Sequence, residues 1–183
     1  AENYQRDKVY TELNFKHQVF QTGTDEKFDS IAYVGNNIGD KTVYNNALER
    51  ISTTQSQFFS VITMQGHLPW GLIDSSITAE GEGFTESQNN DLLAYTRLLS
   101  NTDTATREFL DSLQKIEKKI TVVFYGDHLP GLYPSEVFLD NPDSQFRTEY
   151  FIWSNFETPK LNYPLVNSSD FSALLFKQTN SNN

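Results

Sequence analysis

At 183 residues the chain is long enough to bury one hydrophobic core, and its length gives no reason to expect two. Fourteen Lys and Arg residues against 24 Asp and Glu residues leave a formal net charge of −10, which argues against a general nucleic-acid binder because an acidic surface repels phosphate backbones. The absence of cysteine excludes disulfides, zinc–thiolate sites and thiol catalysis.

The apolar patterning predicts four strands. Segment 28–34 is short and mixed, whereas 57–64 (QFFSVITM) and 120–125 (ITVVFY) are continuous apolar runs rich in β-branched and aromatic residues. Such runs are typical of interior strands, buried on both faces of a parallel sheet. A fourth strand is expected over 149–153 (EYFIW).

Helical patterns lie between and after these runs. Asp40 can cap a helix with an apolar stripe. Thr85 and Gln88 have the capping-box form and open a long helix, and Ser169 or Asp170 caps a last one. The order of elements predicts an α/β sandwich with a central, mainly parallel sheet flanked by helices. No stretch approaches the roughly 18 apolar residues of a membrane span.

Polar motifs follow the two long apolar runs. Gly66 and His67 come just after the first run, and Gly126, Asp127 and His128 come just after the second. Ligands of open parallel sheets bind beyond the carboxyl ends of the strands. Asp127 and His128 offer one carboxylate and one imidazole, half of a ligand set for a divalent metal. The same residues would also serve as hydrogen-bonded turn residues or as a helix cap, so the pattern alone leaves both readings open.

Four segments resemble motifs of one family, in the family's order. Segment 62–70 (ITMQGHLPW) resembles the "ITxxxHxPF" motif of the lipoteichoic acid synthase branch of the sulfatase-like family, and 123–128 (VFYGDH) resembles its "YGDH" motif. Segment 3–10 (NYQRDKVY) resembles "FWNRDxxY", and 170–175 (DFSALL) resembles "DxxPTLL" without the Pro. The resemblance covers nearly the whole chain.

The resemblance implies an alkaline-phosphatase-like, or sulfatase-like, fold of which this chain is a part. Residues 1–177 would be the carboxyl-terminal portion of the catalytic domain, and 178–183 a disordered polar tail. The implied activity is that of a phosphoglycerol transferase, which moves glycerophosphate from the head group of phosphatidylglycerol to a glycerophosphate polymer of the bacterial cell envelope. The full-length protein would be held at the extracellular face of the cell membrane by an amino-terminal part that this chain lacks.

The resemblance also assigns roles to individual residues. Asp127 and His128 would bind a divalent metal, Mn²⁺ or Mg²⁺. His67 would be catalytic and hydrogen-bond the transferred phosphate. Arg6 would grip that phosphate, because a guanidinium donates two parallel bonds to its oxygens, and Tyr4 would line the site where the family has Trp. We expect His67 and Asp127 to converge in one pocket, within roughly 12 Å, if both are to act on one phosphate.

Two parts of the family's site have no counterpart in this sequence. The nucleophilic Thr and a metal-binding Glu lie before the "WNR" segment in the family. In its double displacement that Thr attacks the phosphorus, diacylglycerol leaves, and a polymer hydroxyl then takes the glycerophosphate. The resemblance therefore implies an incomplete metal site and an isolated chain without activity.

Two other readings remain. Another head group or ester could be the substrate, as in phosphoethanolamine transfer or sulfate-ester hydrolysis, which the missing upstream residues would decide. Alternatively, the chain could be a non-catalytic cell-surface binding module that kept the fold. The joint presence of Arg6, His67, Asp127 and His128 favours an enzyme.

Overall fold

The computed structural model describes residues 3–22 and 26–180. None of the helices in these two ranges combines the length and apolar character that a membrane span requires. In chain order the elements are η1 (Asn3–Gln5), α1 (Arg6–Glu12), β1 (Tyr33–Val34), β2 (Asn37–Ile38), α2 (Asp40–Glu49), α3 (Glu86–Gln114), β3 (Thr121–Tyr125), η2 (Ser135–Phe138), η3 (Pro142–Phe146), β4 (Tyr150–Ser154), η4 (Ser168–Asp170) and α4 (Phe171–Gln178).

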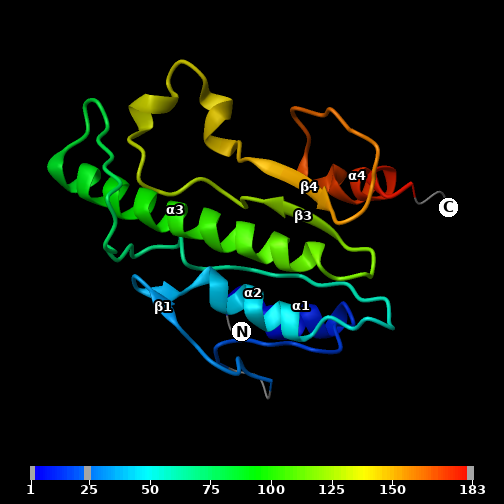
Figure 1. Ribbon diagram of the computed structural model, residues 1–183. Helices are drawn as coiled ribbons and strands as arrows, with labels where there is room; N and C mark the ends of the chain where they lie inside the picture. Colours follow the sequence, from blue (N-terminus) through cyan, green and yellow to red (C-terminus); the bar gives the residue numbers. More distant parts are fainter. Residues whose placement is uncertain (1–2, 23–25, 181–183) are drawn as a thin grey trace.

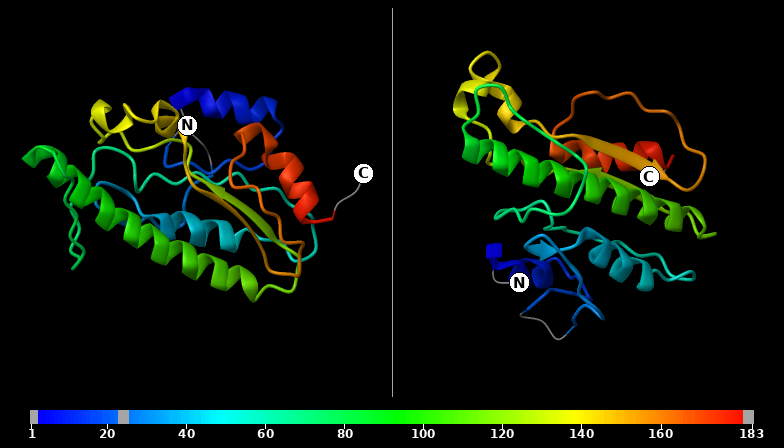
Figure 2. Two further views of the ribbon diagram at one scale, coloured as in Figure 1. Left: turned by 90° about the horizontal axis from the view of Figure 1, so that it is seen from above. Right: turned by 60° about the vertical axis from the view of Figure 1, so that its left-hand side comes forward.

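The long helix α3 organises the molecule. It lies between α2 on one side and the β3–β4 pair with α4 on the other (Figures 1 and 2). The ring of Tyr44 on α2 stacks on Phe109 of α3 at 4.7 Å, and the Tyr44 hydroxyl is 3.1 Å from that of Thr106. Leu98 and Leu113 of α3 are each 1% exposed and form the centre of the core.

Strands β3 and β4 form an antiparallel pair whose aromatic residues face one another across the ladder. Phe124 lies opposite Phe151, and their rings stack at 4.9 Å. At the end of the ladder Tyr125 lies opposite Tyr150, and Phe171 of α4 packs on both rings at 4.8 and 5.4 Å. Because cross-strand aromatic pairs stabilise a sheet, this cluster fixes the register of β3 just before the Asp127–His128 segment.

The expected parallel pairing is not found in the part of the chain that the structure describes. Segment 120–125 does form strand β3, but its ladder joins it to β4 alone and is antiparallel, so β3 is not an interior strand here. The first expected strand is reduced to β1, which pairs antiparallel with β2. An apolar run indicates burial on both faces, but it does not specify the direction of the neighbouring strand.

Segment 57–64 is not a strand, which makes that prediction wrong. A strand requires a hydrogen-bonded neighbour, and the described residues provide none for this segment. Its apolar side chains are exposed as a result, with Phe58 the most exposed at 76%.

The expected polar tail begins later than residue 178. Gln178 is the last residue of α4, is buried, and donates a 2.6 Å hydrogen bond to the Thr158 hydroxyl. Gln178 lies one helical turn after the buried Leu174, so it shares the inner face of α4. Residues 181–183 lie outside the described ranges.

Candidate active site

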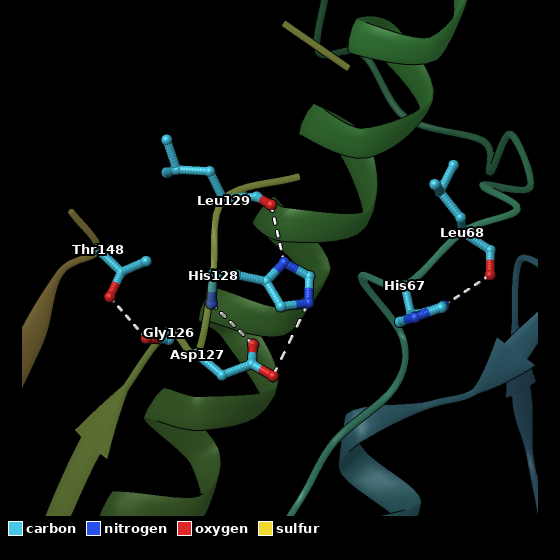
Figure 3. A network of polar contacts seen from close by, with 7 residues as sticks. All are labelled: His67, Leu68, Gly126, Asp127, His128, Leu129 and Thr148. Carbon is cyan, nitrogen blue, oxygen red and sulfur yellow. Dashed lines mark hydrogen bonds and ion pairs between the residues drawn. The ribbon is translucent and has the colours of Figure 1, made fainter. Parts of the chain in front are cut away.

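His67 lies in a tight turn that follows the 57–64 segment. Its backbone N–H donates to the Met64 carbonyl at 3.0 Å, and the indole N–H of Trp70 closes the loop onto the Gly66 carbonyl at 2.9 Å. The His67 side chain is exposed, and its Nδ1 donates to the carbonyl of Leu68 at 2.8 Å (Figure 3). The loop therefore presents the imidazole to solvent with one ring nitrogen already engaged.

Asp127 and His128 lie on the loop that leaves β3. This loop is fastened to the start of β4, because Gly126 N–H donates to the Glu149 carbonyl at 3.1 Å and the Thr148 hydroxyl donates back to the Gly126 carbonyl at 2.6 Å (Figure 3). A Cβ at position 126 would lie 3.1 Å from the Thr148 side chain, so the close approach favours glycine. The sequence did not single out Thr148, whose role follows from the pairing of the two strands.

The hydrogen bond of His128 defines which of its nitrogens is free. Nδ1 lies 2.8 Å from the Leu129 carbonyl, and because a carbonyl only accepts, Nδ1 carries the proton. Nε2 of the neutral ring then keeps its lone pair and lies 3.9 Å from Oδ2 of Asp127. Metal-binding histidines characteristically donate their other ring N–H to a carbonyl or carboxylate in this way.

The pair fits half of a metal site. A lone pair on nitrogen and a carboxylate oxygen 3.9 Å apart can contact one cation at the usual ligand distances of about 2.0–2.2 Å. Both side chains are open, with Asp127 79% and His128 67% exposed. Over residues 3–22 and 26–180 no cluster of three or more His, Asp or Glu ligands is found.

Tyr95 of α3 packs against the loop that carries His67. Its ring packs edge-on against Trp70 at 5.7 Å and lies beside Gly66, where a Cβ would be 3.8 Å away. Burial raises the pKa of the Tyr95 hydroxyl, and the neighbouring Tyr133 raises it further. Tyr133 follows His128 by five residues along the chain. Sequence analysis did not single out Tyr95 as a site residue.

The convergence of His67 and Asp127 stays a prediction. Figure 3 shows both in one close view, and no hydrogen bond or ion pair joins them.

The amino-terminal candidates, Arg6 and Tyr4, form a third group. The guanidinium of Arg6 lies 5.4 Å from the centre of the Tyr4 ring, which is 85% exposed, and no described hydrogen bond or ion pair links either residue to His67, Asp127 or His128.

Comparison with known proteins gives matches along nearly the whole chain. A family model described as Sulfatase matches residues 1–181. The solved structure of the Streptococcus pyogenes phosphoglycerol transferase GacH in complex with sn-glycerol-1-phosphate is 52% identical with a TM-score of 0.93, and the match covers 99% of this chain and 48% of that one.

Two curated relatives come from Rhizobium meliloti (strain 1021). The capsular polysaccharide biosynthesis protein RkpI is 32% identical over 105 residues, which are 57% of this chain and 17% of the relative. A putative cyclic beta-1,2-glucan modification protein is 26% identical over 138 residues, which are 66% of this chain and 21% of the relative. The chain thus spans about half of the GacH chain and about a fifth of these relatives.

The matches confirm the expected fold class, since the structural neighbour superimposes over nearly all of this chain. They also agree with a partial domain, because the same residues make up less than half of the neighbour. The chain therefore belongs to the sulfatase family, among its lipoteichoic-acid-synthase-like members.

Proposed function

We propose that this chain is part of a metal-dependent phosphoglycerol transferase that takes glycerophosphate from phosphatidylglycerol. The observation that carries the proposal is the match of 99% of the chain, at 52% identity, to a phosphoglycerol transferase in complex with sn-glycerol-1-phosphate. In the complete protein the transfer would take place at the extracellular face of the bacterial membrane, where its lipid donor is anchored.

Each candidate side chain has its own proposed role. Asp127 and His128 would hold Mn²⁺ or Mg²⁺ through Oδ2 and Nε2, while Leu129 keeps the imidazole in the required tautomer. The cation, when bound, supplies positive charge against the negative charge that develops at the phosphate. His67 would donate to a phosphate oxygen through Nε2 as the imidazolium, with both ring nitrogens protonated, because its Nδ1 already donates to the Leu68 carbonyl. Arg6 would bind further phosphate oxygens beside Tyr4.

The acceptor is proposed to be a cell-envelope polymer, and the curated relatives favour a polysaccharide. Both are named for polysaccharides, one capsular and one a cyclic glucan. A sugar hydroxyl is chemically equivalent to a glycerol hydroxyl as the group that accepts glycerophosphate. The nucleophile and the remaining metal ligands are expected from residues beyond this chain.

The test uses the complete protein that carries this chain, supplied with labelled phosphatidylglycerol and saturating Mn²⁺. We expect Asp127→Ala and His128→Ala each to weaken Mn²⁺ binding by at least about 10-fold, since even partners of metal ligands contribute 10- to 100-fold. Release of the head group should fall as Mn²⁺ binding weakens. Asp111→Ala removes an exposed carboxylate of α3 and is the matched control.

Three outcomes would contradict the proposal. Full turnover by Asp127→Ala would show that Asp127 is not a ligand of the catalytic metal. Release from phosphatidylethanolamine in preference to phosphatidylglycerol would assign a different head group. Binding of a polymer without release from either lipid would indicate a cell-surface binding module.

A further inference from the structure

The His67 loop is held by side chains from the β1–β2 hairpin. Nδ2 of Asn37 donates to the backbone carbonyl of His67 at 2.7 Å, and Nδ2 of Asn36 donates to the carbonyl of Pro69 at 3.2 Å. The two donors are consecutive residues, Asn36 in the turn between β1 and β2 and Asn37 as the first residue of β2. The hairpin therefore fixes the backbone of the residue whose side chain is the candidate phosphate ligand.

The hairpin and the loop are also in direct backbone contact. A Cβ at Gly71 would lie 2.8 Å from the Cα of Gly35, and one at Gly35 would lie 2.9 Å from the Gly71 carbonyl oxygen. Gly35 in addition has a φ of +62°, in the left-handed region. Two glycines at these positions let the turn approach closely enough for Asn36 and Asn37 to reach the loop.

A buried network fixes the same loop on its amino-terminal side. Gln65 is 1% exposed, and its Oε1 accepts from the Asp40 backbone N–H at 3.0 Å. Its Nε2 donates to the Leu98 carbonyl at 3.0 Å and to the Thr102 hydroxyl at 3.1 Å. The Gln65 N–H donates to Oδ1 of Asp40 at 3.3 Å. Residue 65 is thereby locked between α2 and α3.

From these contacts we infer that Asn37 is a positioning residue for His67, acting with the buried Gln65 to set where the imidazole meets the phosphate. The inference rests on the proposed role of His67. Residue 65 is anchored by its own side chain, and residue 67 is anchored by Asn37. Only Gly66, which has no side chain, separates these two anchored residues. A hydrogen bond to phosphate needs its two atoms within about 3.2 Å, so a small displacement of the loop weakens it.

The experiment measures the affinity of the complete protein for sn-glycerol 1-phosphate. Loss of one hydrogen bond predicts a 3- to 10-fold weaker affinity for Asn37→Ala. Mn²⁺ affinity should stay unchanged, because Asp127 and His128 lie on a loop anchored by Thr148 and Glu149 instead. Asn45→Ala is the matched control, since Asn45 is an exposed amide on α2 away from the loop.

A double-mutant cycle separates positioning from a general structural effect. If Asn37 acts through His67, then Asn37→Ala should change the affinity little in a His67→Ala background. An equal loss in both backgrounds, or an unchanged affinity of Asn37→Ala alone, would overturn the inference. If His67→Ala by itself leaves the affinity unchanged, the proposed role of His67 fails instead, so the two failures can be told apart.

Discussion

His67 and His128 have the same local arrangement because they share a local sequence. Each is followed by Leu and Pro, and in each the Nδ1 atom donates to the carbonyl of that Leu at 2.8 Å. A residue before proline is disfavoured in the helical region, which helps to keep the Leu carbonyl beside the ring. The sequence predicted both histidines as site residues, but their free Nε2 atoms become visible only from this hydrogen bond.

Asp40 is a buried carboxyl at the start of α2, and it is 1% exposed. Burial raises its pKa above the ordinary value, while hydrogen bonds from the Thr102 hydroxyl, the Gln65 backbone and Thr63 act in the opposite direction. The Thr102 hydroxyl donates to Oδ2 of Asp40 at 2.6 Å, a shorter bond than the one from the Gln65 N–H to Oδ1 at 3.3 Å. No Lys or Arg forms an ion pair with Asp40 in the described chain.

The raised pKa gives stability a definite dependence on pH. The folded state binds the proton more tightly than the unfolded state, so the contribution of Asp40 is fully present below about pH 4 and is lost as the pH rises through the folded pKa. We expect the free energy of unfolding of the wild type, relative to Asp40→Asn, to fall as the pH rises above about 4. Urea unfolding of both proteins across this range measures it. A gap that is constant or grows with pH would contradict the prediction.

Among the elements, local capping signals predicted helices well. Thr85 is the N-cap of α3, with the capping box to Gln88 formed as expected. Asp40 instead occupies the first residue of α2 behind the N-cap Gly39. These signals succeed because a cap bonds to residues only three positions away. The 57–64 strand failed because its formation depends on a neighbour that no local pattern specifies.

Asn155 joins three elements at the end of β4. Its Nδ2 lies within 3.2 Å of the carbonyls of Leu113, Ile116 and Lys118, which follow one another at the end of α3 and before β3. Its Oδ1 accepts from the Ile120 N–H at 2.8 Å. The side chain thus bonds to one carbonyl in the last turn of α3 and to two carbonyls in the connection from α3 to β3.

We expect Asn155→Ala to lower the free energy of unfolding by about 2 kcal/mol, because it leaves several partly buried backbone groups without a partner. Asn155→Asp keeps the acceptor for Ile120 but loses the donor, so it should be destabilised comparably. Gln114→Ala, which removes only an exposed 3.3 Å hydrogen bond to the Asn155 carbonyl, is the control. Chemical denaturation checks all three, and a near-neutral Asn155→Ala would show that solvent replaces the side chain.

At the scale of the molecule, the site candidates lie on separate segments. The His67 loop packs on α3 through Trp70 and Tyr95, Asp127 and His128 lie on the loop after β3, and Arg6 and Tyr4 form an amino-terminal group of their own. The family resemblance named the site candidates, but it carries no information on the distances between them. The distances depend on how α1, the two loops and α3 pack in the complete domain, which no local rule provides.

Two features of this chain bear on the proposal that its activity needs residues from outside it. Phe58, Phe59, Val61, Ile62 and Met64 are 37–76% exposed, in a segment that has no strand partner among the described residues. The proposed metal ligands in this chain are Asp127 and His128, and both are open to solvent. A cation held by two ligands keeps several waters and gains little from chelation.

The 183-residue chain alone should therefore bind Mn²⁺ at least about 10-fold more weakly than the complete protein and release no head group from labelled phosphatidylglycerol. Its exposed apolar segment should also bind a hydrophobic dye that the complete protein does not bind. Isothermal titration with Mn²⁺, the release assay and dye fluorescence, each run on both proteins, check the three expectations. Equal dye binding would mean that segment 57–64 stays uncovered in the complete protein. Turnover by the chain alone would mean that a Thr or Ser within these 183 residues attacks the phosphorus, and that the nucleophile has been misplaced.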